Sequence, residues 1–121
     1  MYILRHDTSA VKIFNAQVVT AAGNALSTEI DLRRTEGYLA LQWTITGDGT
    51  GKFEVLSSLN GVDFLDINTD IAAAQTKTTG PSSDGKNAAS ATCIPCPVVK
   101  IKVTETGGVN SITVTAWIFG S

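Results

Sequence analysis

The chain has 121 residues, of which 43% are hydrophobic and 17% are charged, and its formal net charge is −2. A chain of this length allows one domain with a single core, and the apolar fraction excludes a disordered tail. The basic residues are scattered, apart from the pairs Arg33 with Arg34 and Lys100 with Lys102. We therefore expect no nucleic-acid partner, because nucleic-acid binding needs a concentrated basic surface.

Short strand candidates occupy the first third of the chain. Residues 1–5 could form an edge strand, or they could belong to an N-terminal arm covering residues 1–10. Residues 11–20 and 27–33 are rich in β-branched and apolar residues, which predicts two strands joined through residues 21–24.

The clearest strand pattern lies in residues 38–46, where large apolar side chains alternate with small or polar ones. Such a period of two indicates a half-buried strand. Residues 47–51 contain three glycines and predict a turn, and the alternation resumes in residues 52–57. We therefore predict that these two strands pair as a β-hairpin with a five-residue loop.

The next segment has weaker signals. Asn60 and Gly61 form a tight-turn dipeptide, and residues 64–67 predict a short strand. Residues 68–92 are dominated by small and polar side chains, so we predict a long loop that could contain a short strand or a helical turn near residues 71–75. Loops of this length in small domains are often functional.

Two alternating strands are expected at residues 98–104 and 111–119, on either side of a turn at residues 105–110. The whole pattern predicts a single all-β domain over residues 1–121. It would be an antiparallel β-sandwich, jelly-roll-like or immunoglobulin-like, with about seven or eight strands. No apolar run approaches the ~20 residues of a spanning helix, and no signal-peptide pattern follows Met1, so we expect no membrane partner.

Cys93 and Cys96 form a CxxC motif, which in other settings is a redox pair or half of a metal site. A redox CxxC opens a helix, whereas this one leads into a predicted strand. A zinc site needs about four ligands, and the remaining soft candidate is His6. We expect two small, semi-buried cysteines and an exposed His6, so no cofactor is predicted; a metal shared between subunits is the alternative.

Asp63, Asp66 and Asp70 could suggest a calcium loop, but their spacing lacks the pattern of an EF-hand. A catalytic triad would need a placed nucleophile and base, and the chain has a single histidine. We therefore expect a protein that is not an enzyme.

The aromatic residues divide into two groups. Trp43 and Phe53 lie on the apolar sides of their strands and are expected in the core. Trp117 and Phe119 lie on the opposite side of the last strand, and we predict that they form a subunit interface. Tyr2 and Ile3, in the N-terminal segment, are further interface candidates. The alternative is a sugar-binding row, which would require Trp117, Phe119 or Tyr38 to be exposed together.

An ordered set of segments is similar to the small β-sandwich proteins of tailed-bacteriophage virions. In that family a strand pair is followed by a turn of the form Ser-x-(Asn/Asp)-Gly-x-(Asp/Asn)-(Phe/Trp), and a later basic and apolar strand closes the sheet. The matching segments here are residues 28–32, 39–46, 53–57, 60–64 and 99–104.

The resemblance implies a virion structural protein, most specifically a capsid decoration (cement) protein or a head or tail fibre base. It implies contacts with the major capsid protein or other virion proteins, a homo-oligomer such as a trimer, and assembly in the host cytoplasm. The family offers no catalytic residues. A carbohydrate- or receptor-binding module, or a tail accessory module, is the alternative function.

Overall fold

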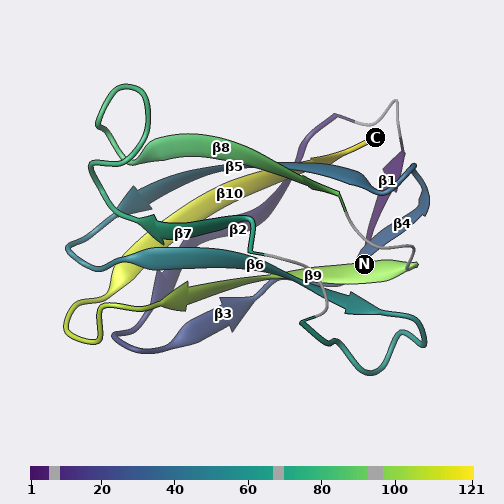
Figure 1. Cartoon of the computed structure of the whole chain (residues 1–121), viewed down its shortest axis with the longest axis horizontal. Coiled ribbons are helices and arrows are strands. Elements are labelled where there is room, and N and C mark those ends of the chain that lie inside the picture. Colours follow the sequence, from purple (N-terminus) through teal and green to yellow (C-terminus); the bar gives the residue numbers. More distant parts are fainter. Residues whose placement is uncertain (6–8, 67–69, 93–96) are drawn as a thin grey trace.

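The computed structural model describes residues 1–5, 9–66, 70–92 and 97–121. These residues form ten strands (Figure 1): β1 (Tyr2–Arg5), β2 (Val11–Val19), β3 (Asn24–Leu26), β4 (Ile30–Arg34), β5 (Tyr38–Thr46), β6 (Gly51–Ser58), β7 (Ala72–Gln75), β8 (Lys86–Thr92), β9 (Val98–Glu105) and β10 (Ile112–Gly120). Within these ranges the chain has no helix with the length and hydropathy needed to cross a bilayer.

The strands form two sheets that pack face to face. Sheet A has the order β1-β4-β9-β6-β7, and β3 also pairs with β9. Sheet B has the order β2-β10-β5-β8. All pairings are antiparallel except that of β1 with β4, which is parallel. The predicted all-β sandwich is therefore confirmed, with more strands than the seven or eight expected.

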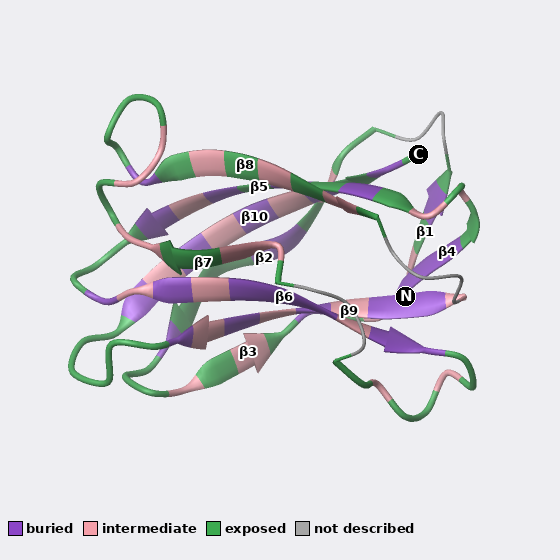
Figure 2. Cartoon of the chain, viewed as in Figure 1, coloured by how far each residue is buried: buried purple, intermediate pink, exposed green. Residues whose placement is uncertain are grey.

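The core lies between the two sheets because each central strand buries every second side chain (Figure 2). Trp43 of sheet B and Phe53 of sheet A are both buried, as predicted, and their rings stack across the sandwich. The ring centroids are 4.5 Å apart, with an angle of 29° between the ring planes. This contact joins the centres of the two sheets.

The predicted hairpin of residues 38–57 is wrong, although both of its strands exist. β5 belongs to sheet B and β6 to sheet A, so residues 47–50 cross from one sheet to the other. Gly47 has a φ of +93°, and the loop passes so close to the β9–β10 connection that a Cβ on Gly49 would lie 2.6 Å from the Asn110 carbonyl oxygen. The two strands thereby place Trp43 and Phe53 on facing layers.

A buried carboxylate fixes the loops at this end of the sandwich. Glu105 is only 1% exposed, and its side chain accepts hydrogen bonds from the backbone N–H groups of Ala22, Thr50, Gly107 and Gly108. The donor–acceptor distances lie between 2.7 and 3.1 Å. These backbone donors hold the pKa of Glu105 down at about 2, because they favour the ionised form. One side chain therefore links three connections between strands.

The N-terminal residues form an edge strand and not a free arm. β1 pairs with β4, and Leu4 inserts into the core with an exposure of 1%. Residues 6–8 lie outside the described residues, so the proposed arm of residues 1–10 is described only in part.

The prediction of a loop over residues 68–92 is also wrong. The segment contains β7, close to the short strand expected at residues 71–75. It also contains the seven-residue strand β8, which pairs with β5 along its length. β8 is rich in alanine, since a strand at the sheet edge needs little apolar bulk to close the core. The strand expected at residues 64–67 is reduced, among its described residues, to a single bridge between Leu65 and Ser57.

Candidate functional site

The outer face of sheet B carries the side chains of its strands that do not enter the core. On β10 the outward residues include Trp117 and Phe119, and on β5 they include Tyr38, Ala40 and Gln42. Successive side chains of a strand point to opposite faces, so this surface follows directly from the alternation that builds the core.

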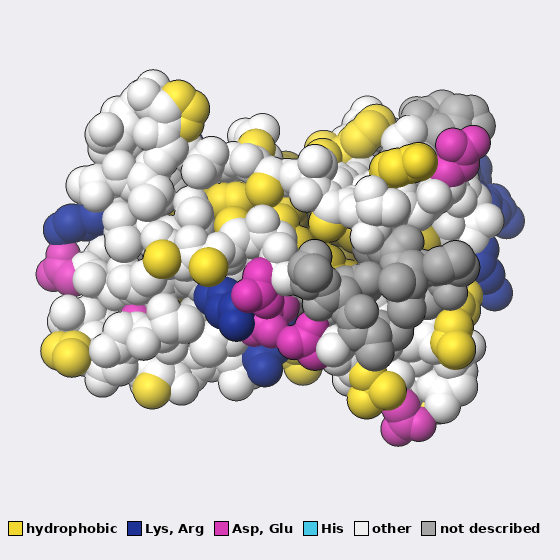
Figure 3. Space-filling view, in the orientation of Figure 1, with side chains coloured by type: hydrophobic (Ala, Val, Ile, Leu, Met, Phe, Trp, Pro, Cys, Tyr) yellow, Lys and Arg dark blue, Asp and Glu magenta, His cyan; other side chains and the backbone are white. Residues whose placement is uncertain are grey.

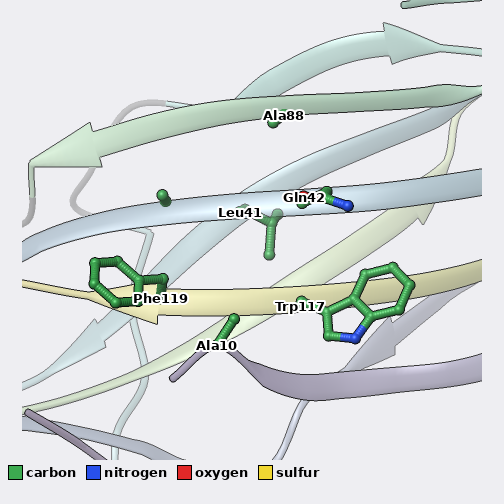
Figure 4. Close-up of a pocket in the computed structure, with 7 residues that line it drawn as sticks. Ala10, Leu41, Gln42, Ala88, Trp117 and Phe119 are labelled. Atoms are coloured by element: carbon green, nitrogen blue, oxygen red, sulfur yellow. The ribbon is translucent and has the colours of Figure 1, made fainter. Parts of the chain in front are cut away.

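A groove of about 150 Å³ lies on this outer face. Figure 4 shows its lining, which comes from β10, β5, β8 and the residue just before β2. The lining residues are Ala10, Ala40, Leu41, Gln42, Ala88, Trp117 and Phe119.

The groove follows from strand register. Trp117 lies opposite Gln42, and Gln42 lies opposite Ala88. Phe119 lies opposite Ala40. Two large rings therefore stand on one strand while two methyl groups lie on the neighbouring strands, and this difference in size leaves a hollow beside the rings.

The aromatic surface continues beyond the groove. Phe119 is 39% exposed, and Tyr38 is 53% exposed at the start of β5. Because Phe119 pairs with Ala40, Tyr38 lies diagonally across from Phe119 on the same face, a spacing of roughly 7–8 Å between strand neighbours. Tyr38 and Phe119 are thus exposed beside the half-buried Trp117 on one face.

Polar groups accompany the rings. Gln42 is exposed, and within the described part of the chain its amide has no hydrogen-bond partner. Lys12 of β2 lies opposite Trp117, and its Nζ atom is 5.5 Å from the ring centroid. This distance corresponds to a cation–π contact. The face therefore offers aromatic surface, an amide and a cation side by side.

The interface residues predicted from the sequence do not form one surface. Trp117 and Phe119 lie together on sheet B, whereas Tyr2 and Ile3 belong to β1 of sheet A. Tyr2 is partly buried against the core, and Ile3 is exposed. The weak metal candidates His6, Cys93 and Cys96 lie outside the described residues.

The three aspartates considered for calcium do not lie together in the structure. Asp66 and Asp70 lie with Glu54 of β6, one oxygen of each within 4.8 Å of the others. Asp63 instead accepts a hydrogen bond from the Asn60 side chain, at 2.9 Å, within the turn after β6.

Figure 3 shows acidic side chains beside lysine over this part of sheet A. Lys52 forms an ion pair with Asp70 at 3.3 Å. Burial raises the pKa of Glu54, Lys52 opposes that rise, and the adjacent Asp66 adds to it. The arrangement is a charge network in which a lysine already balances one of the carboxylates.

Sequence reasoning did not identify five of the seven lining residues, which are Ala10, Ala40, Leu41, Gln42 and Ala88. Their signal is present in part, because Ala40 and Gln42 are the outward positions of the best-defined strand. Ala88 could not be placed, because its strand was not predicted.

Neither a model of a known protein family nor the sequence of a curated protein matches the chain. Several solved structures are similar to it in fold. The carbohydrate-binding module CBM36, in complex with calcium and xylotriose, has 16% identity and a TM-score of 0.49 over 94% of this chain and 89% of its own. CsCBM6-3 from Clostridium stercorarium, in complex with cellobiose, has 15% identity and a TM-score of 0.48 over 98% and 96%.

PliG from Aeromonas hydrophila, a periplasmic inhibitor of g-type lysozyme, has 12% identity and a TM-score of 0.46 over 99% of this chain and 96% of its own. Because one fold carries many functions, these likenesses concern the fold alone.

Proposed function

We propose that this chain is a non-catalytic β-sandwich module that binds carbohydrate on the outer face of sheet B. The observation that carries the proposal is the groove in which Trp117 and Phe119 stand beside the small side chains of Ala40 and Ala88.

Sugar rings need the combination of groups that this face offers. A sugar ring presents apolar C–H groups on its faces and hydroxyl groups around its rim. The ring faces pack on aromatic side chains, and the hydroxyl groups need hydrogen-bonding partners. Trp117 and Phe119 supply the aromatic surface, and the Gln42 amide lies opposite Trp117. The hydroxyl groups of Thr44 and Ser90 lie on the same face.

The size of the groove supports a ligand that lies on the surface. Its volume of about 150 Å³ is below the roughly 300 Å³ at which ordinary small-molecule pockets begin. A hollow of this size accepts one ring of a longer chain, and the exposed Tyr38 offers a further aromatic contact on the same face.

The test is a glycan array followed by calorimetric titration of the best-binding oligosaccharide. Trp117→Ala should lose at least roughly tenfold in affinity, as expected for a central aromatic contact. Phe64→Ala is the matched control, because Phe64 also lies under a lysine, Lys100 at 4.3 Å, but outside sheet B. The proposal fails if the wild-type protein binds no oligosaccharide, or if Trp117→Ala binds as tightly as Phe64→Ala.

A virion structural role, as a capsid decoration or fibre-base protein, is a second proposal. Its structural support is the loop after β6, where Leu59, Val62 and Leu65 are between 58% and 78% exposed. Exposed apolar side chains gathered on one loop are typical of interaction surfaces. A double variant, Leu59→Ser with Val62→Ser, should no longer sediment with purified phage particles. A wild-type protein that remains monomeric and does not sediment with particles would contradict this role.

A further inference from the structure

The charges of the protein are divided unevenly between its two sheets. The four strands of sheet B contain no aspartate or glutamate, and their charged residues are Lys12 and Lys86. The described acidic residues lie in sheet A and in the connections between strands. A protein with a net charge of −2 therefore has one face whose strands carry only positive charge.

Three basic residues outside sheet B are already paired with carboxylates. Arg33, Lys52 and Lys77 each form an ion pair with an aspartate. Lys12 and Lys86 are exposed, and neither ammonium group forms an ion pair within the described part of the chain, although the backbone N–H of Lys86 donates to Asp84 Oδ1 at 3.1 Å. Their ammonium groups are consequently available to an anion.

The two lysines also flank the groove. Lys12 belongs to the edge strand β2 and lies beside Trp117. Lys86 belongs to the opposite edge strand β8, where it pairs with Thr44, one outward position along from Gln42. Three strand spacings separate β2 from β8, which is roughly 14 Å. A short oligosaccharide lying across the strands would meet a cation at each edge and the Trp117 ring between them.

We infer that the carbohydrate bound by this face is acidic, carrying carboxylate or sulfate groups, and that Lys12 recognises an acidic group while a sugar ring packs against Trp117. The inference rests on the proposed carbohydrate-binding function. At an exposed position the contact of Lys12 with the Trp117 ring is weak, so the ammonium group can turn toward an anion at little cost. A bond between an ammonium and a carboxylate or sulfate is charge-assisted and stronger than one to a neutral hydroxyl.

The test compares oligosaccharides of one backbone in neutral, uronic-acid and sulfated forms. Calorimetric titrations are run with the wild-type protein, Lys12→Gln and the control Lys100→Gln. Lys100 belongs to β9 of sheet A, and its Nζ atom lies over the ring of Phe64, which follows β6. At about 0.01 M ionic strength, Lys12→Gln should bind the acidic form roughly threefold to tenfold more weakly, a clearly larger loss than it shows for the neutral form. Raising the ionic strength to about 1 M should remove most of that difference, because the screening length falls from about 30 to about 3 Å.

The outcomes separate the two proposals. Tighter binding of the uronic-acid form alone, or of the sulfated form alone, with loss in Lys12→Gln supports the inference and identifies the anion. Equal binding of neutral and acidic forms, with the same effect of Lys12→Gln on both and loss of binding in Trp117→Ala, overturns the inference and leaves carbohydrate binding intact. Absence of binding to every form overturns both.

Discussion

Replacing Glu105 by Gln changes one oxygen of a buried carboxylate into an NH₂ group without changing its size. In the wild-type protein one carboxylate oxygen accepts from the N–H groups of Ala22 and Gly108, and the other accepts from those of Thr50 and Gly107. An amide can keep one of these pairs. Whichever way it turns, its NH₂ group faces two backbone donors that then have no acceptor.

The expected cost follows from that count. Two donors left unpaired at a site with 1% exposure are among the larger losses that a single substitution causes. In a domain of this size, the loss should lower Tm by on the order of 10 °C at neutral pH. Three connections between strands lose their common anchor, so their amides should also exchange hydrogen faster.

The effect should depend on pH in a defined direction. The pKa of Glu105 is about 2 in the folded protein, below its ordinary value of 4.5, so its stabilisation is fully present above about pH 4.5 and is lost as the pH falls toward 2. Thermal unfolding of the wild type, Glu105→Gln and the exposed control Glu36→Gln should be followed by circular dichroism across that range. A Glu105→Gln variant that melts with Glu36→Gln at every pH would refute the reasoning.

Two further predictions concern the sandwich itself. Phe53→Ala removes the ring that stacks on Trp43 and should lower the free energy of unfolding by about 3–5 kcal/mol in urea titrations. Phe53→Leu should lower it much less. Equal losses in the two variants would contradict a close-packed centre. Gly85→Ala should destabilise the protein more than Gly61→Ala. Both glycines have a positive φ, but a Cβ on Gly85 would lie 2.4 Å from the Ile45 carbonyl oxygen, whereas a Cβ on Gly61 would lie in open space. Equal Tm values of the two variants would show that the contact at Gly85 relaxes.

The sequence allowed the strands and their faces to be predicted wherever apolar residues alternate. The pattern of residues 38–46 correctly placed Trp43 in the core, and that of residues 111–119 correctly put Trp117 and Phe119 on the other side of their strand. Alternation specifies which side chains share a face, and that is enough to identify the two aromatic residues of the groove.

Pairing between strands could not be predicted in the same way. A glycine-rich connection is compatible with a hairpin and with a crossing between sheets, so β5 and β6 were wrongly paired. β8 escaped detection because a strand at a sheet edge can consist of alanine, serine and asparagine. Because β8 was not predicted, neither Ala88, which lines the far side of the groove, nor Lys86, the second cation of sheet B, could be placed.

The most direct test of the carbohydrate-binding face uses the two tryptophans as reporters in ¹H–¹⁵N NMR spectra. Trp117 lies in the groove, whereas Trp43 is buried in the core of the same molecule. Titration with the oligosaccharide that binds best on the array should shift the indole N–H signal of Trp117, together with the amide signals of Ala40, Gln42 and Ala88, and should leave the indole signal of Trp43 in place. Shifts confined to sheet A, or an unmoved Trp117 signal at saturation, would contradict the proposed binding face.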